Sequence, residues 1–220
     1  MRDLIMSDFL KSLAVPGTTP SGGAVAALGV AQAAALLARA AGADRELRAE
    51  AEVLRMHALR LAEKDAHAVG QFALAGLAAG AAALAACLPA ADVIAAAAKA
   101  LTLAERLLPA SGLLGAVLPE PGLSGARSSN TGSSGTVPSW MVSPDVAAVA
   151  EIARSSAMTA RVAIETRLGA VTGDAAIALR ATVASVDGLA ERATWVTAAV
   201  RAANASAEYA TSGLSNQPVG

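Results

Sequence analysis

An aspartate on an otherwise apolar helix face is the first residue in this sequence that could do chemistry. Between Leu47 and Phe72, leucine, alanine and phenylalanine recur in steps of four and three, and Asp65 occupies one of these positions. This spacing places them on one face of a helix that packs in a bundle. A buried carboxylate is costly unless it is paired, changes its pKa or meets a ligand. Asp65 is therefore our candidate for proton transfer, and the alternative is a paired structural carboxylate.

A pair of glycines marks the start of an earlier helix, in the run TTPSGGAVAALG at residues 18–29. We expect Thr19 to be the N-cap and Pro20 the first helical residue. A helix N-terminus carries unpaired amides and partial positive charge, and glycine lets an anionic or planar ligand approach them. Gly22 and Gly23 are therefore candidate ligand contacts. The alternative is that they allow close contact between helices.

The remaining chemically capable residues are weaker candidates. Asp145 follows a Ser-Pro pair at an expected helix start, where the helix dipole alone favours an acidic residue. His57 and His67 are expected to face solvent, and two histidines are too few to predict a metal site. Cys87 is the only cysteine, which excludes a disulfide framework, and we expect it to be a small buried residue.

The elements that must position these residues are all expected to be helices. Gly42 is the expected C-cap of one helix and Asp44 the N-cap of the next. Pro89 with Asp92 marks a further start, and Asp174 is expected to cap the last helix. No stretch has a convincing strand pattern. The predicted helices span residues 4–14, 21–41, 45–80, 90–108, 143–169 and 174–209.

Composition predicts how such helices pack. Hydrophobic residues make up 55% of the chain but aromatics only 2%, so the excess is mostly alanine, a strong helix former and a poor core filler. We predict one all-α domain over residues 1–220: an Ala-rich bundle of five or six long helices. A long Gly/Ser/Pro loop, residues 109–142, precedes the fourth long helix and is predicted to be a flexible insert. Residues 210–220 are predicted to fray.

Charge and hydropathy limit the partners. The formal net charge is −1 and no basic run occurs, which argues against nucleic acid. The uncharged stretches 22–38 and 68–91 raise a membrane alternative, but alanine and glycine dominate them, so we expect helices of a soluble bundle. The first residues lack a signal-peptide pattern, so the cytoplasm is the expected location.

Three motifs together resemble a known family. The run FLKSLAVPGTTPSGGAVAALGVAQAAALLA is similar to an opening of phenylalanine, a Leu-Ala pair, Pro-Thr-Pro-Gly-Gly-Gly-Ser and an alanine-rich helix. An Asp-Ala pair in the second long helix matches Asp65-Ala66, and an aspartate opening a later helix matches Asp145. These features resemble the formiminotetrahydrofolate cyclodeaminase and methenyltetrahydrofolate cyclohydrolase family. In the opening, the matching residues are Phe9, Leu13, Ala14, Thr19, Pro20, Gly22, Gly23, Ala26 and Ala27.

The resemblance implies a helical homodimer that binds a tetrahydrofolate derivative as substrate and needs no metal. It implies closure or opening of a ring at the folate one-carbon unit: 5-formimino to 5,10-methenyl with release of ammonia, or addition of water to the 5,10-methenyl form. Asp65 would then be the acid or base. The residues expected to contact substrate are Thr19, Gly22, Gly23 and Asp145.

Four positions depart from the family pattern. Ser21 replaces its third glycine and Ala24 its serine, and Ala163 and Glu165 stand where the family carries an arginine and an asparagine. Several polar groups that could hold folate are therefore missing or changed. This favours the alternative hypothesis, a non-catalytic or divergent helical dimer that binds another small ligand or a partner protein.

Overall fold

The computed structural model describes residues 21–75, 79–108 and 143–214, together with residues 8, 11 and 13–15. All regular structure in these residues is helical, which confirms the predicted all-α single-domain fold. Thr19, the insert 109–142 and the last residues of the chain lie outside the described residues, as does most of the predicted helix 4–14. The long helices are α2 (Gly22–Ala40), α3 (Arg45–Leu74), α4 (Ala79–Arg106), α5 (Pro144–Leu168) and α6 (Gly173–Leu214).

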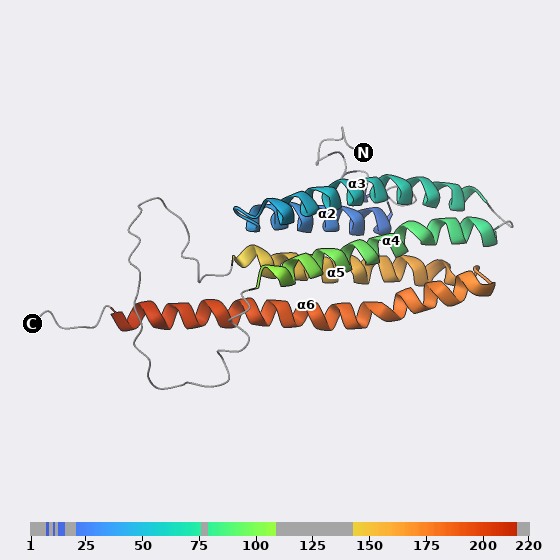
Figure 1. Ribbon diagram of the computed structural model, residues 1–220. Coiled ribbons are helices and arrows are strands. Elements are labelled where there is room, and N and C mark those ends of the chain that lie inside the picture. Colours follow the sequence, from blue (N-terminus) through green and yellow to red (C-terminus); the bar gives the residue numbers. More distant parts are fainter. Residues whose placement is uncertain are drawn as a thin grey trace, which may run out of the picture.

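The five helices lie nearly parallel to one axis and alternate in direction along the chain (Figure 1). In this view α2 and α3 form the upper part of the bundle, α4 and α5 the middle, and α6 the lower edge. The shortest helix, α2, begins part-way along α3, whereas α6 continues beyond the ends of α4 and α5. The first turn of α2 therefore lies against the side of α3 and not at the end of the bundle.

Small side chains bring the helices together, as the composition predicts. Gly29 of α2 packs on Ser156 of α5, where an added Cβ would lie 2.4 Å from the serine Oγ. The core contains many fully buried alanines, and its largest fully buried side chains are leucine, isoleucine and valine. Contact between such small residues lets helix backbones approach closely, so even one added methyl group would disturb the packing and destabilise the bundle.

The predicted apolar face of α3 is confirmed. Six of its positions are buried in the bundle, including Asp65, and Ala68 and Phe72 near the end of the helix are half-buried. The six buried positions are Leu47, Ala51, Leu54, Ala58, Leu61 and Asp65.

Two predicted helix starts are confirmed, but both ends of α2 differ from the prediction. The C-cap of α2 is Ala41 and not the predicted Gly42, which follows it with φ +55°. Asp44 caps α3 as predicted, since its side chain accepts a 2.9 Å bond from the Leu47 amide. Ser143 caps α5 by accepting from the Asp145 amide at 3.2 Å. At α2, however, the residue in the N-cap position is Ser21 and not Thr19, and its hydroxyl does not cap its own helix.

The predictions were wrong at two other helix starts. Pro89 lies inside α4, which begins at Ala79, because the stretch before the proline is mostly alanine and the helix can tolerate one missing backbone hydrogen bond. The final helix begins at Gly173, whose φ is +68°, so Asp174 lies in the first turn and is not the cap.

One helix end also differs from the prediction: the helix containing Asp65 ends at Leu74, earlier than predicted.

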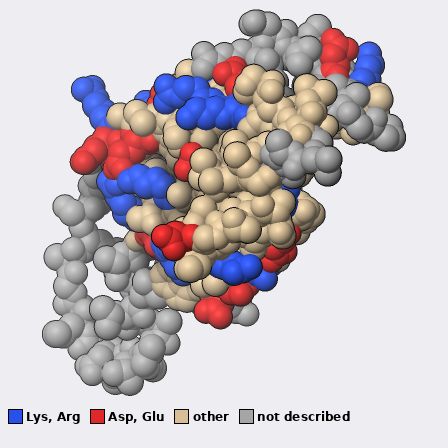
Figure 2. All heavy atoms as spheres, turned by 90° about the vertical axis from the view of Figure 1, so that its right-hand side faces the viewer, with Lys and Arg blue, Asp and Glu red and all other residues tan. Residues whose placement is uncertain are grey.

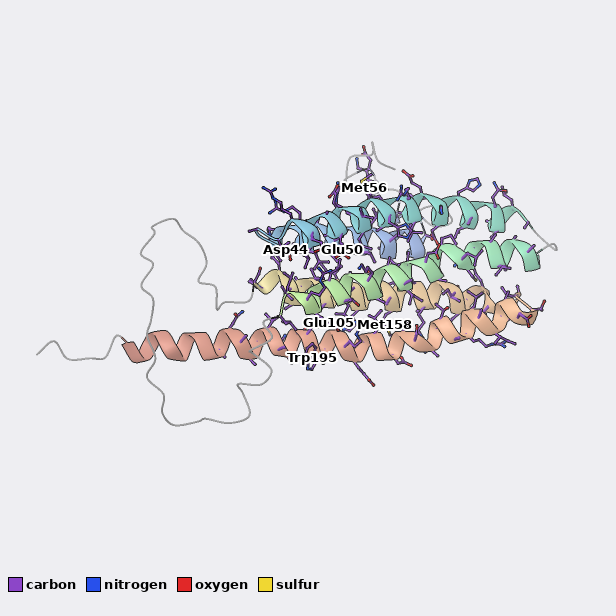
Figure 3. The ribbon with its side chains drawn as sticks, in the orientation of Figure 1. Asp44, Glu50, Met56, Glu105, Met158 and Trp195 are labelled. Atoms are coloured by element: carbon purple, nitrogen blue, oxygen red, sulfur yellow. The ribbon has the colours of Figure 1, made fainter. Side chains whose placement is uncertain are left out.

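Ion pairs join neighbouring helices around the outside of the bundle. Glu50 of α3 accepts from Lys99 of α4 at 2.6 Å and also from Arg106, and Glu105 of α4 pairs with Arg192 of α6 at 2.7 Å. Figure 3 shows Glu50 between α3 and α4 and Glu105 between α4 and α6. Seen end-on, acidic and basic side chains alternate along parts of the edge, and uncharged residues fill the middle (Figure 2).

Within the described residues, two helices are long and apolar enough to cross a membrane: α2 and the Gly80–Arg106 part of α4. Half of the most apolar window of each is buried inside the bundle. Core helices of soluble proteins have the same composition, so this feature does not choose between the bundle and membrane alternatives.

Candidate functional site

Asp65 reaches from α3 to the first turn of α2 and is completely buried. The Ser21 hydroxyl donates a hydrogen bond to its Oδ2, and the backbone amide of Ala24 also acts on the carboxyl. Its Oδ1 has no hydrogen-bond partner among the described residues. The sequence prediction that Asp65 lies on the buried face is thus confirmed, whereas its role as an acid or base stays a prediction.

The position of Asp65 follows from where α2 begins. A helix start leaves its first amides without partners, and a side-chain oxygen at the N-cap normally accepts from one of them. Ser21 stands at that position, but its hydroxyl turns to Asp65. The carboxyl of α3 therefore lies at the positive end of α2, where the helix dipole favours negative charge.

Gly23 makes room for this carboxyl. A Cβ at Gly23 would lie 2.2 Å from Asp65 Oδ1, 2.6 Å from Cγ and 2.9 Å from Oδ2, so the whole carboxyl group would clash with it. Gly22 is different, because it is exposed and an added Cβ would meet only the Thr159 methyl at 3.7 Å. The two candidate glycines thus have separate roles: Gly23 seats a carboxyl, and Gly22 leaves the first turn uncovered.

Burial raises the pKa of Asp65 above its ordinary value, and it is the largest influence on the group. The Ser21 hydroxyl, the positive charge of Arg167 on α5 and the Ala24 amide lower the pKa in part. A carboxyl with a raised pKa holds its proton at a higher pH than usual, which suits general acid–base chemistry. Sequence reasoning missed Arg167, since no motif links it to α3, and it treated Ser21 only as a substitution.

Asp145 does not share this site. It accepts two hydrogen bonds from the Arg39 guanidinium, one from Nε at 2.6 Å and one from Nη2. The Arg39 contact lowers the pKa of Asp145 below its ordinary value. Arg39 lies in the last turn of α2 and Gly23 in the first, roughly 24 Å apart at 1.5 Å per residue. The role of Asp145 in substrate binding stays a prediction, and it would have to act at the other end of α2.

The other chemically capable residues do not gather around Asp65. His67 is exposed and His57 half-buried, while Cys87 is buried with its Sγ 3.9 Å from the Ile164 carbonyl. Burial raises the pKa of this thiol. In the described ranges, no three His, Cys, Asp or Glu side chains come together in a group that could hold a metal.

The two departures in α5 have structural explanations. Ala163 is buried in the core, and Glu165 is exposed and pairs with Arg161 at 2.8 Å. Arg161 also pairs with Asp187 of α6 at 2.8 Å, so these residues join α5 to α6. Neither position presents a free polar group toward Asp65.

A groove of about 560 Å³ runs along the outer face of α2, between α3 and α5. Its lining is mainly apolar, and Asp65 is not part of it because the groove and the carboxyl lie on opposite faces of α2. One lining residue, Thr159, also lies next to Gly22, so the groove reaches the first turn of the helix. Residues lining the groove include Val25, Leu28, Gln32, Leu59, Ile152 and Thr159.

Comparison with known proteins supports the fold but not a family assignment. No protein-family model matches the sequence, and no curated protein does. Among solved structures, the chain is similar to the crystal structure of formiminotetrahydrofolate cyclodeaminase from Thermotoga maritima, with a TM-score of 0.67 and 17% identity over 90% of this chain and 98% of that one. A likeness at this identity establishes a shared helical fold.

Proposed function

We propose that this protein is a divergent member of the formiminotetrahydrofolate cyclodeaminase and methenyltetrahydrofolate cyclohydrolase family, acting on 5-formimino- or 5,10-methenyl-tetrahydrofolate. The observation that carries the proposal is the Asp65 carboxyl, buried against a glycine at the first turn of α2. It stands in a bundle whose fold is that of a formiminotetrahydrofolate cyclodeaminase. Fold likeness alone would not suffice, because function depends on the site.

The chemistry proposed for Asp65 is proton transfer at a one-carbon unit held between two nitrogens. In ring closure the acid form would protonate the departing nitrogen as ammonia leaves. In addition of water to the methenyl form, the carboxylate would accept a proton from the attacking water. A raised pKa serves the first role, since more of the acid form persists toward neutral pH.

The substrate is proposed to bind at the first turn of α2. Gly22 is exposed there and is followed directly by Gly23, the residue against which the Asp65 carboxyl packs. Thr19, two residues before the N-cap, keeps its predicted role as a substrate contact. We also propose that the protein is a cytoplasmic homodimer that binds neither nucleic acid nor membrane. Light scattering of protein purified without detergent would test the dimer and show whether the protein stays in solution without a membrane.

The experiment is a titration of purified protein with 5,10-methenyl-tetrahydrofolate, following both binding and loss of the methenyl absorbance. Release of ammonia from the 5-formimino compound, measured in parallel, would identify the cyclodeaminase reaction. The proposal predicts binding and turnover of one of the two compounds. Absence of binding to both would contradict it.

The full burial of Asp65 favours a second candidate function. A carboxyl that has no exposed surface and lies at the start of α2 could serve only to hold that helix in place. The protein would then be a non-catalytic or divergent helical dimer that binds another small ligand or a partner protein. Binding of folate without turnover, unchanged in Asp65→Asn, would support this candidate.

A further inference from the structure

Ser21 is the hydroxyl that touches the buried carboxyl. It occupies the N-cap position of α2 but makes no capping bond to its own helix, and it donates to Asp65 Oδ2 instead. The residue is itself half-buried, so the pair lies between the bundle interior and the start of α2. The proposed reaction gives Ser21 no role, and the family that this sequence resembles carries glycine at this position.

We infer that Ser21 is a positioning residue of this site, whose hydroxyl holds Asp65 Oδ2 at the first turn of α2 and favours the charged form of the carboxyl. A hydrogen bond donated to a carboxylate stabilises the ionised form more than the neutral form. A glycine cannot make this bond. Ser21 therefore limits how far burial suppresses ionisation of Asp65.

Few groups face Asp65 and could stabilise its charged form. From α2 come the Ser21 hydroxyl and the Ala24 amide, and from α5 comes the charge of Arg167. Arg167 donates to the Ala163 carbonyl and acts on Asp65 only through its charge. It acts on the Cys87 thiol of α4 in the same way. Among these influences, the Ser21 bond opposes burial most strongly.

The inference deepens the proposed function. It rests on that function only for the claim that the Asp65 proton is transferred in the reaction. If Asp65 is the acid or base, Ser21 sets the pH range in which it works. Replacing Ser21 with the family's glycine should raise the pKa of Asp65, so the acid form should persist to higher pH.

The experiment is a ¹³C NMR titration of the Asp65 carboxyl in the intact protein and in Ser21→Ala, Ser21→Gly and Ser21→Thr. The titration midpoint should move to higher pH in the alanine and glycine variants and return toward the original value with threonine, which restores a hydroxyl. Thr197→Ala is a matched control, because Thr197 also donates to a carboxylate between two helices, Glu151, at 3.1 Å. It should leave the Asp65 midpoint unchanged.

An Asp65 midpoint that is the same in all Ser21 variants would overturn the inference, as would an equal shift in Thr197→Ala. The titration needs no turnover, so it remains decisive even if neither folate is a substrate and the proposed function fails. If the protein is active, one limb of its kcat–pH profile should move with the Asp65 midpoint: the alkaline limb where Asp65 acts as the acid, and the acid limb where it acts as the base. A kcat–pH profile that stays fixed while the midpoint moves would show that Asp65 is not the reacting group, and would leave the role of Ser21 intact.

Discussion

Two aspartates at opposite ends of α2 show how different surroundings give one residue type different properties. Asp65 meets the first turn of the helix, is completely buried and has a raised pKa because of that burial. Asp145 meets the last turn through the Arg39 guanidinium, has 17% of its side chain exposed and has a lowered pKa. The two carboxyls thus differ in their partners and in their contact with water: Asp145 accepts from a guanidinium and is partly exposed, whereas Asp65 accepts from a neutral hydroxyl and is completely buried.

The largest expected effect is on turnover, and it applies to only one of the two aspartates. Asp65→Asn keeps the shape of the side chain but removes its ionisation, so turnover of the proposed folate substrate should fall by about 10²-fold or more. Asp145→Asn is the comparison and should change kcat much less, because its predicted role is a substrate contact, whose loss should appear in KM and not in the proton-transfer step. Steady-state kinetics of both variants would check this, and equal losses would remove the functional distinction between the two carboxyls.

The next largest effect concerns stability and the seat of Asp65. Gly23→Ala puts a methyl group into the carboxyl, which cannot turn away without losing its contact with Ser21. Such overpacking should lower the free energy of unfolding by roughly 1–3 kcal/mol in urea denaturation. Gly22→Ala, whose Cβ would meet only an ordinary 3.7 Å contact, should be neutral or slightly stabilising. Equal unfolding free energies for the two variants would contradict the claim that Gly23 makes room for the Asp65 carboxyl.

A smaller effect is the pH dependence of stability, which should have opposite signs for the two aspartates. The folded pKa of Asp65 is raised, so its contribution is greatest below the unfolded pKa, near 3.9, and is lost as pH rises through the folded pKa. The folded pKa of Asp145 is lowered, so its contribution is present above the unfolded pKa and is lost as pH falls through the folded value.

Urea unfolding at a series of pH values would measure these slopes. Asp65→Asn should remove part of a decline in stability with rising pH, and Asp145→Asn part of a decline with falling pH. If the two variants changed the profile in the same direction, the assigned pKa directions would be wrong for one of them.

The smallest expected effect is that of the Arg39 pair on stability. Arg39 is largely exposed, so the pair with Asp145 is screened by water and salt. Arg39→Gln should lower the urea midpoint slightly at low salt, and the difference from the original protein should shrink at high salt. A loss that persists undiminished at high salt would indicate that the pair acts by packing and not by charge.

The fold was more predictable than the site, for physical reasons. Helix periodicity, Gly42 and Asp44 are local signals, so they gave the helices and the buried face that carries Asp65. Pro89 misled because a proline can also be accommodated inside an alanine-rich helix. The partners of Asp65 and Asp145 come from other helices. No local sequence pattern shows which carboxyl the Ser21 hydroxyl or the Arg39 guanidinium contacts.

The most direct measurement of this account is one ¹³C NMR titration in which both aspartates are followed in the same sample, with Asp65→Asn and Asp145→Asn used to assign the carboxyl signals. The account predicts that Asp65 titrates above the ordinary aspartate value of about 3.9 and Asp145 below it. Coincident titrations, or Asp145 titrating above Asp65, would contradict it.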